Sequence, residues 1–430
     1  MIIAAIMIVF LVLLTMGMPV NFALGLLGIA ALYIFMGGTA GLEAAALVAW
    51  ATANSFTLTA IPLFILMGDL IFRVGFGKDL FDAASAWFGR VRGGLGIATI
   101  FACGIFSAVS GSSAAACAAM GMLAIPEMER YHYNKRLVYG TVSAGGSLDI
   151  LIPPSVILIV YGAFAEQSIA KLYLAGFIPG FILSFFFMVI IYVWTRLFPA
   201  DAPIVEVKLT LREKFQKTKH SLVFILLVGA CLGTIYVGIA TPTEAAGLGA
   251  AFTVLTAFLM GRLTWPALKE SLLSTVSVTC MVLFLVLGGL ILSNFLMSQN
   301  IPNQIMEYAF SLGLTDWKLL IVLYVVYALM GCLIDGLTLI IVTLPIVVPM
   351  MKKMGVDLIW FGIVIVMLVE LAQLHPPVGM NLFIVRNISK GKIEDVIIGS
   401  APFIIAIVAA LLLVTLFPSI VVYLPRLIKY

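Results

Sequence analysis

Charged side chains are scarce in this sequence: they make up 10% of its 430 residues, whereas 63% are hydrophobic. A soluble protein of this length could not bury that much apolar surface in its core. Apolar stretches of about 20 residues, the length that crosses a bilayer, recur between short charged connections. The sequence therefore predicts an all-α polytopic membrane protein without a soluble domain. Its net charge of +4 is what basic cytoplasmic loops would give, so we expect no nucleic-acid binding.

Several common sequence features are also missing. No Walker A sequence is present, which argues against a primary pump. The apolar N-terminal run has neither a charged start nor a cleavage site, so we expect a first span rather than a removable signal. The cysteines lie in apolar segments without CxxC or Cys/His spacing, which argues against a disulfide framework or a zinc site. They are Cys103, Cys117, Cys231, Cys280 and Cys332.

The order of apolar segments repeats once along the chain. Four pairs of prolines and glycines recur at a nearly constant separation, which indicates an internal duplication. The pairs are Pro19 and Pro242, Pro154 and Pro377, Gly176 and Gly399, and Gly111 and Gly336. We therefore predict a first repeat at 1–199, a cytoplasmic linker at 200–220 and a second repeat at 221–430. Within the first repeat, 45–72 is expected to be one span.

Each predicted repeat contains a hairpin followed by a broken helix. A polar tip at 110–113 interrupts an apolar run, and irregular backbone at membrane depth survives only where it is buried in protein or lines a wet cavity. We therefore predict re-entrant hairpins at about 94–127 and 319–350. Pro-Pro pairs remove helix hydrogen bonds, so 137–164 and 358–385 are predicted to be broken helices. The small residues at these places also suit close helix packing, an alternative that the sequence leaves open.

Charge placement predicts how the two repeats are oriented. Arginines and lysines flank the first hairpin, whereas the mixed flanks of the second hairpin fit the opposite side of the membrane. Five crossings per repeat would invert the second copy, giving about ten transmembrane spans plus two re-entrant hairpins. An inverted repeat with paired broken helices is typical of secondary transporters that bind their solute near the midplane.

No lysine or arginine lies in the predicted hairpins or at the Pro-Pro breaks. An anionic substrate would then need bound cations or exposed helix N-termini as positive partners. Hydroxyl, carbonyl and carboxylate oxygens suit a small hard cation such as Na+. The predicted first Na+ site comprises Ser110, Gly111, Ser112, Ser113, Gly146 and Pro153, and the second comprises Cys332, Asp335, Thr338, Gly379, Met380 and Asn381. The residues predicted to reach the substrate are Ser110, Ser155 and Asn381.

The acidic residues inside the predicted spans allow other interpretations. Asp149, Asp335 and Glu370 could accept hydrogen bonds from nearby backbone groups instead of binding a ligand. Asp149 and Asp335 could also be the paired acids of an intramembrane hydrolase, although neither lies in a Gly-x-Gly-Asp setting. A passive anion channel is a further alternative. Of these classes we expect a transporter and not an enzyme.

Six motifs together resemble the large membrane subunit of the tripartite ATP-independent periplasmic (TRAP) transporters, and the resemblance covers essentially the whole chain. They are AIPLFILMG at 60–68, RGGL at 92–95, VSGSSAA at 109–115, IPPS at 152–155, ATPTEAA at 240–246 and PPVGMN at 376–381. The resemblance implies an elevator-type transporter in the lipid of the bacterial inner membrane, driven by a sodium gradient. It assigns the Ser-Gly-Ser-Ser tip and the Pro-Pro-Ser break to a first cation site, and the second hairpin with Gly-Met-Asn to its symmetry mate.

The same resemblance implies two protein partners. One is a small four-helix membrane subunit, and the other is a soluble periplasmic binding protein that delivers the substrate. The substrate class that it implies is a small organic acid, such as a C4-dicarboxylate or a sialic acid.

Overall fold

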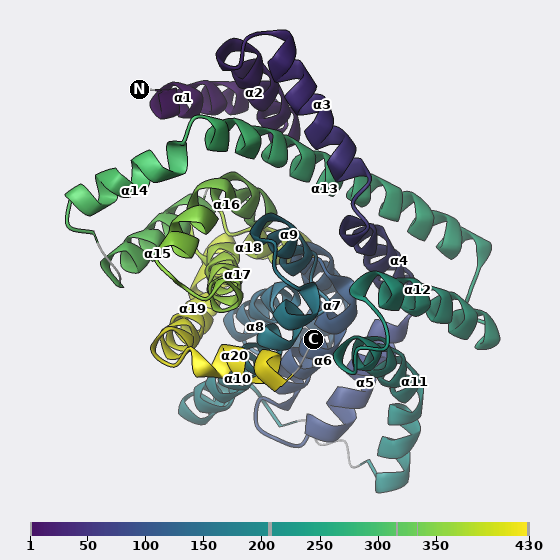
Figure 1. Ribbon diagram of the computed structural model, residues 1–430. Helices are drawn as coiled ribbons and strands as arrows, with labels where there is room; N and C mark the ends of the chain where they lie inside the picture. The colour runs from purple at the N-terminus through teal and green to yellow at the C-terminus, as the bar shows by residue number, and fades with distance from the viewer. Residues whose placement is uncertain (1, 205–208, 315–316, 333, 428–430) are drawn as a thin grey trace.

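Helices form nearly all of the described structure (Figure 1). The computed structural model describes residues 2–204, 209–314, 317–332 and 334–427, without the side chains of residues 2–4, 7, 109, 110, 220 and 224. No strand occurs in these residues, so the predicted all-α class is confirmed. Five of the described helices are long and apolar enough to cross a membrane, or up to seven if two bent pairs each form one span. The predicted total of about ten spans would be reached only if shorter apolar helices also crossed the membrane, so this total stays a prediction.

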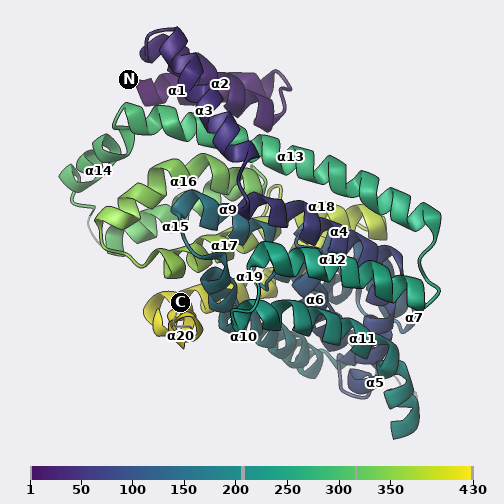
Figure 2. The same cartoon turned by 45° about the vertical axis from the view of Figure 1, so that its right-hand side comes forward.

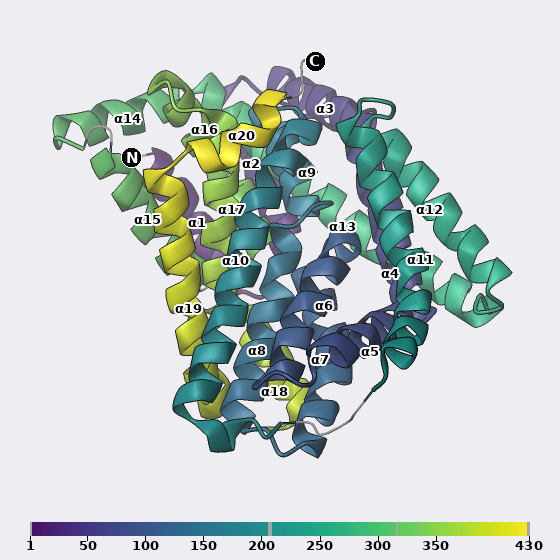
Figure 3. The ribbon, with the colours of Figure 1, turned by 90° about the horizontal axis from the view of Figure 1, so that it is seen from below.

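One group of helices forms an outer layer along one side of the molecule (Figures 1 and 2). Its longest member, α13, runs across the molecule and packs against α2, α3 and α4. Helix α4 also packs on α12, and α11 packs on α5 and α12, so these helices lie side by side at one edge (Figure 3). The outer layer consists of α1 (Ile2–Thr15), α2 (Val20–Phe35), α3 (Thr39–Ala53), η1 (Thr57–Thr59), α4 (Ala60–Arg73), α5 (Phe76–Phe88), α11 (Leu211–Tyr236), α12 (Pro242–Leu259), α13 (Trp265–Ser298) and α14 (Ile301–Ser311).

The remaining helices form an inner bundle. Its centre is made by α8, which packs against α6, α7, α18 and α19, and by α17, which packs against α15, α16 and α19. Both central helices are buried almost throughout, from Leu137 to Ser147 and from Trp360 to Leu374. The inner bundle consists of α6 (Gly94–Ser110), α7 (Ser113–Arg130), α8 (Lys135–Ser147), η2 (Leu148–Ile150), α9 (Val156–Ala165), α10 (Ile169–Leu197), η3 (Pro199–Asp201), α15 (Trp317–Gly331), α16 (Gly336–Lys353), α17 (Leu358–Leu374), α18 (Met380–Ser389), α19 (Ile393–Leu416) and α20 (Ser419–Leu427).

Glycines allow the inner helices to approach each other closely. A Cβ atom on Gly140 of α8 would lie 2.0 Å from the Gly399 carbonyl oxygen of α19. A Cβ atom on Gly399 would in turn lie 2.0 Å from the Arg136 carbonyl oxygen. Small residues at such contacts are how membrane helices gain packing energy where lipid offers no hydrophobic driving force between them.

Helix starts follow the repeat spacing that the sequence predicts. In both halves of the chain, two helices joined by a short tip (α6–α7, α15–α16) precede two helices joined by a break (α8–α9, α17–α18). Matching helices begin at nearly the same separation as the two Pro-Pro pairs. The matching starts are Ser113 of α7 with Gly336 of α16, Lys135 of α8 with Leu358 of α17, and Ile169 of α10 with Ile393 of α19. The division into two domains and their opposite orientation in a membrane stay predictions.

The segment at 45–72, expected to be one span, is interrupted in the structure. Helix α3 ends at Ala53, and the helical path from Thr57 to Arg73 is bent by 52° relative to it. The intervening residues include Asn54 and Ser55, whose side chains compete for backbone hydrogen bonds. The hydroxyl of Thr59 donates to the Phe56 carbonyl oxygen at 2.5 Å in this bend.

The predicted linker at 200–220 is partly helical, because α11 begins at Leu211, and its bounds stay a prediction. Thr210 and Glu213 form a capping box: the Glu213 N–H donates to the Thr210 hydroxyl, and Glu213 Oε2 accepts from the Thr210 N–H at 2.7 Å. Thr-x-x-Glu is a known start signal for a helix. The basic residues that follow it obscured that signal, because they gave the segment the polarity of a loop.

Candidate functional site

The tips of the two predicted hairpins meet at one cavity of about 180 Å³, which we call the central cavity. The α6–α7 tip contributes residues 111–113, and the α15–α16 tip contributes Asp335 and Gly336. The outer layer contributes Ile65 of α4 and Val278 of α13, so the cavity sits between the inner bundle and the outer layer. No lysine or arginine is among its described lining residues.

The first tip turns sharply at a glycine. Helix α6 ends at Ser110, Gly111 adopts a left-handed conformation with φ +64°, and α7 begins at Ser113. A Cβ atom on Gly111 would lie 3.3 Å from Val156 Cγ2, so the tip rests against the start of α9. Ser112 and Ser113 line the central cavity, whereas the side chain of Ser110 lies outside the described part of the chain, so its two predicted roles stay predictions.

The second tip is capped by an aspartate. Asp335 Oδ1 accepts hydrogen bonds from the N–H groups of Leu337 (3.1 Å) and Thr338 (3.2 Å), which starts α16. Asp335 thus accepts backbone hydrogen bonds, while its predicted role as a cation ligand stays a prediction. Its side chain also lines the central cavity, whereas Thr338 is buried within α16.

Cys332 lies beside this tip but is not among the residues that line the central cavity. Its Sγ atom donates to the Ala328 carbonyl oxygen at 3.0 Å and lies 3.0 Å from His375 Nδ1 and 3.3 Å from the Pro376 carbonyl oxygen. The thiol therefore links the end of α15 to the break between α17 and α18. Its predicted role as a cation ligand stays a prediction.

The break between α8 and α9 is closed by its own side chains. Ser155 Oγ donates to the Ile150 carbonyl oxygen at 2.7 Å and accepts from the Leu158 N–H at 3.5 Å. Ser155 does not line the central cavity, so its predicted contact with the substrate gains no support from this geometry. Pro153 is buried within the same break. Gly146 serves packing, because a Cβ atom there would lie 2.5 Å from Cys117 Cβ of α7.

The break between α17 and α18 is arranged differently. Gly379 has φ +46°, and a Cβ atom there would lie 3.1 Å from both the Gln373 and the His375 carbonyl oxygens. Leu382 Cδ1 would lie 2.9 Å from the same position, so two carbonyl groups and one side chain leave no room for a Cβ atom at Gly379. Met380 lines the central cavity, while the next residue, Asn381, is fully buried.

The side-chain oxygen of Asn381 has no hydrogen-bond partner among the described residues. Its Nδ2 donates to the Ser143 carbonyl oxygen of α8 at 3.3 Å, but its Oδ1 is buried without a hydrogen-bond partner among the described residues. Buried polar atoms normally have partners, so an unpaired amide oxygen indicates a place for a ligand. Carbonyl and amide oxygens are the donors that a hard cation prefers, so the residues of this break fit Na+.

A second hollow of about 190 Å³ adjoins the central cavity and shares Ile65, Ser112 and Val278 with it. It extends along α4 to Arg73, which is not among the site residues predicted from the sequence. Arg73 Nε donates to Asp69 Oδ2 at 2.6 Å, and Arg73 Nη1 donates to Glu270 Oε2 at 2.5 Å. The guanidinium is therefore already paired with two carboxylates, and these pairs join α4 to α13.

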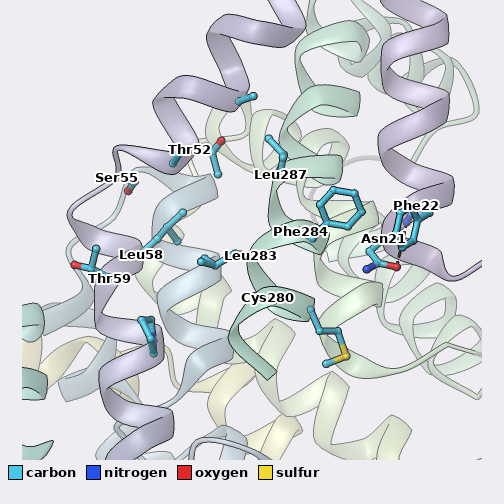
Figure 4. A pocket seen from close by; sticks show the side chains of 14 residues that line it. Asn21, Phe22, Thr52, Ser55, Leu58, Thr59, Cys280, Leu283, Phe284 and Leu287 are labelled. Carbon is cyan, nitrogen blue, oxygen red and sulfur yellow. Dashed lines mark hydrogen bonds between the residues drawn. The ribbon is translucent and has the colours of Figure 1, made fainter. Parts of the chain in front are cut away.

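A further hollow, of about 710 Å³, is lined by α2, α3, the α3–α4 bend and α13, and it shares only Met281 with the lining of the central cavity. Figure 4 shows Asn21 and Phe22 of α2 on one side of it, and Leu58 and Thr59 of the α3–α4 bend on the other. No charged residue is among its described lining residues. Its polar lining side chains are uncharged and include those of Asn21, Thr52, Ser55 and Thr59.

The geometry does not support paired catalytic acids. Asp149 is fully buried in η2 and is not among the residues lining the cavity that Asp335 faces. Within the described residues no group of three or more histidine, cysteine, aspartate or glutamate side chains could hold a metal ion. Glu370 is also fully buried, in α17, where neither carboxylate oxygen has a hydrogen-bond partner among the described residues.

Known proteins resemble this chain over nearly its full length. A C4-dicarboxylate TRAP transporter large permease protein of Pseudomonas aeruginosa is 34% identical over 94% of each chain. A sialic acid TRAP transporter large permease protein of Vibrio cholerae is 29% identical, covering 96% of this chain and 95% of that protein. An isethionate TRAP transporter permease protein of Oleidesulfovibrio alaskensis is 31% identical over 95% of this chain but only 64% of its own length.

A solved structure has a similar fold. The crystal structure of the YdaH transporter of Alcanivorax borkumensis matches with a TM-score of 0.60 at 15% sequence identity, over 86% of this chain and 87% of that chain. The family model of the tripartite ATP-independent periplasmic transporter, DctM component, matches residues 7–420. The chain is thus a multi-pass transporter of the bacterial inner membrane and not an enzyme. It belongs to the DctM component family of the tripartite ATP-independent periplasmic transporters.

Proposed function

We propose that this protein imports a small organic acid together with sodium ions, and that a periplasmic binding protein delivers the acid. The observation that carries the proposal is the meeting of both hairpin tips at a central cavity without a described basic side chain. The relatives described above are named for C4-dicarboxylate, sialic acid and isethionate, all of which are anions at neutral pH. An anion in such a cavity needs cations, because burying an unpaired charge is expensive.

Sodium would enter this scheme as a transported ion. At the second break, the carbonyl oxygens near Gly379 and the unpaired Oδ1 of Asn381 are candidate ligands. At the first tip, the hydroxyl groups of Ser112 and Ser113 are candidates. Ions bound there would add positive charge next to the central cavity and order the tip and the break. The acid would then bind more tightly when sodium is present, and sodium would bind more tightly when the acid is present.

The proposed movement is an elevator-like displacement of the inner bundle against the outer layer. Support comes from the composition of the cavity wall, since α4 and α13 belong to the outer layer while both tips belong to the inner bundle. A bundle that slides along α4 and α13 would carry the acid between the two sides of the membrane. The adjoining hollow that leads to Arg73 would be one exit from the central cavity.

The proposed partners follow from the family. This chain matches 64% of the length of one relative, the isethionate permease protein DctMQ. That relative is therefore about half again as long as its matched part. We propose that this chain works instead with a separate small four-helix membrane subunit, in addition to the binding protein. The apolar outer surface of the helices would face membrane lipid.

Uptake by the reconstituted permease, with its membrane partner and binding protein, tests the coupling. We expect accumulation of labelled acid above the external concentration only under an inward sodium gradient. Equal uptake in potassium would contradict sodium coupling, and uptake that never exceeds equilibrium would indicate a channel. Asn381→Ala should raise the sodium concentration for half-maximal uptake by about tenfold, whereas Asn54→Ala, at the exposed end of α3, should not change it.

A further inference from the structure

Resting on the proposed function, we infer that Gln373 selects acids that carry a hydrogen-bond donor, such as a hydroxyl or an amide N–H, beside their anionic group. Gln373 lies in the last turn of α17 and lines the central cavity. Its side chain is only 7% exposed, and its Oε1 atom is buried without a hydrogen-bond partner among the described residues. A donor group on a ligand in that cavity would supply the partner that this buried oxygen lacks.

The side chain of Gln373 is placed beneath the second hairpin tip. Its Nε2 atom lies 3.6 Å from the position that a Cβ atom on Gly336 would occupy. The glycine therefore leaves room for the amide between α17 and the start of α16. Asp335, which also lines the cavity, precedes Gly336 and brings a second acceptor group to the same side.

The chemistry of the amide determines what it can recognise. A carboxamide presents one acceptor oxygen and one donor NH2 group, and a half-turn of the amide exchanges them without removing either. A plain carboxylate offers acceptors only, so it satisfies the NH2 group but leaves Oε1 unpaired. A hydroxyl group can accept from the NH2 group and donate to Oε1 or to Asp335. The cavity wall therefore favours a ligand with a donor at this point.

The first repeat has no such group at the matching position. Ile150 precedes Pro154 by the same number of positions as Gln373 precedes Pro377, and its side chain also lines the central cavity. One wall is therefore aliphatic where the other carries a carboxamide. This asymmetry would orient the acid, with its donor group toward α17 and its anionic group toward the hydroxyls of the first tip.

Thermal stabilisation of the purified full-length permease by matched acids tests this inference. The probes are malate with succinate, lactate with propionate, and isethionate with ethanesulfonate, each pair differing by one hydroxyl, with sodium present. We expect the hydroxylated member of a bound pair to have at least about tenfold higher affinity, because a site built to bond a hydroxyl rejects an analogue that lacks it. Uptake competition in proteoliposomes should give the same order.

Variants of Gln373 provide the second arm. Gln373→Met keeps the length of the side chain but cannot form these hydrogen bonds, so we expect the affinity ratio to fall to about one. Gln373→Glu keeps acceptor oxygens, so it should weaken binding of both acids through charge repulsion yet retain the preference for the hydroxyl. Gln304→Met, on the exposed surface of α14, is the control and should leave the ratio unchanged.

The outcomes separate this inference from the proposed function. Equal affinities within every bound pair in the wild type, or a ratio unchanged by Gln373→Met, would overturn the role of Gln373 while leaving acid transport intact. Should Gln373→Met fail to fold, loss of the hydroxyl preference in Gln373→Glu would overturn it as well. If no acid of any pair stabilised the permease or entered proteoliposomes, both the inference and the proposed function would be wrong.

Discussion

The two Pro-Pro breaks occupy equivalent places in the sequence but satisfy their backbone differently. In the α8–α9 break, residues 147–155 are all buried, and the Ser155 hydroxyl bonds the Ile150 carbonyl oxygen at 2.7 Å. In the α17–α18 break, the residue that matches Ser155 is Val378, which is 42% exposed and has no hydroxyl to offer. The carbonyl oxygen that matches that of Ile150 belongs to Gln373, and it lies 3.1 Å from the position that a Cβ atom on Gly379 would occupy.

This difference teaches that a duplicated motif need not perform the same task twice. A carbonyl group that a neighbouring hydroxyl already satisfies has less to offer a cation. A carbonyl group that no side-chain hydroxyl bonds retains that capacity. The sequence predicts two matched cation sites, but the first break is closed by the hydroxyl of its own serine, whereas the second has no hydroxyl at the matching position. We therefore expect the second break to respond to ligands and the first to hold the fold together.

The largest expected effect comes from adding a side chain at Gly379. Gly379→Ala would place a Cβ atom 3.1 Å from two carbonyl oxygens and 2.9 Å from Leu382 Cδ1, on a backbone with φ +46°. Alanine is strained at positive φ, and the carbonyl groups would have to turn away from their present directions. We expect sodium-driven uptake to fall by about a hundredfold, measured in proteoliposomes at equal protein content.

A matched control separates the two causes of that effect. Gly355 also has positive φ, at +71°, but a Cβ atom there would meet nothing within 4 Å. Gly355→Ala therefore adds the same type of backbone strain without touching carbonyl groups, and it should reduce uptake far less. Comparable losses in both variants would refute the idea that the carbonyl groups at the second break matter for transport.

A smaller effect is expected from opening the closed break. Ser155→Ala removes the hydroxyl that bonds the Ile150 carbonyl oxygen and caps α9. A buried carbonyl left unpaired and a lost cap together should lower the free energy of unfolding by about 1 to 2 kcal/mol. Denaturant unfolding of the purified protein measures this change, with the sodium concentration for half-maximal uptake recorded in parallel.

The counterpart in the second break is Val378→Ala, which should change stability by less than about 0.5 kcal/mol because Val378 is partly exposed and makes no described hydrogen bond. If Ser155→Ala left stability unchanged but abolished uptake, Ser155 would belong to the transport site, as the sequence predicts. The comparison between the two breaks would then be wrong.

The sequence was sufficient to predict where the helices break, because proline removes a backbone donor whatever surrounds it. It was not sufficient to predict what fills each break. The partner of Ser155 is a carbonyl group in the same short break, and nothing in the sequence distinguishes that contact from one with substrate. Gln373 and Arg73 were missed because their neighbours, Gly336 and Glu270, come from distant segments. Their only signal was a polar side chain within an apolar run.

The smallest expected effect concerns Cys332, which touches the second break from the tip of the α15–α16 hairpin. Its thiol contacts His375 and the Pro376 carbonyl oxygen at 3.0 and 3.3 Å. Cys332→Ser keeps a donor at this place, so stability should change by less than about 0.5 kcal/mol. Oxygen is a better ligand for sodium than sulfur is. A thiol that coordinates the ion would therefore give a lower half-maximal sodium concentration after Cys332→Ser. A thiol that only links the tip to the break would leave that concentration unchanged, which is the result we expect.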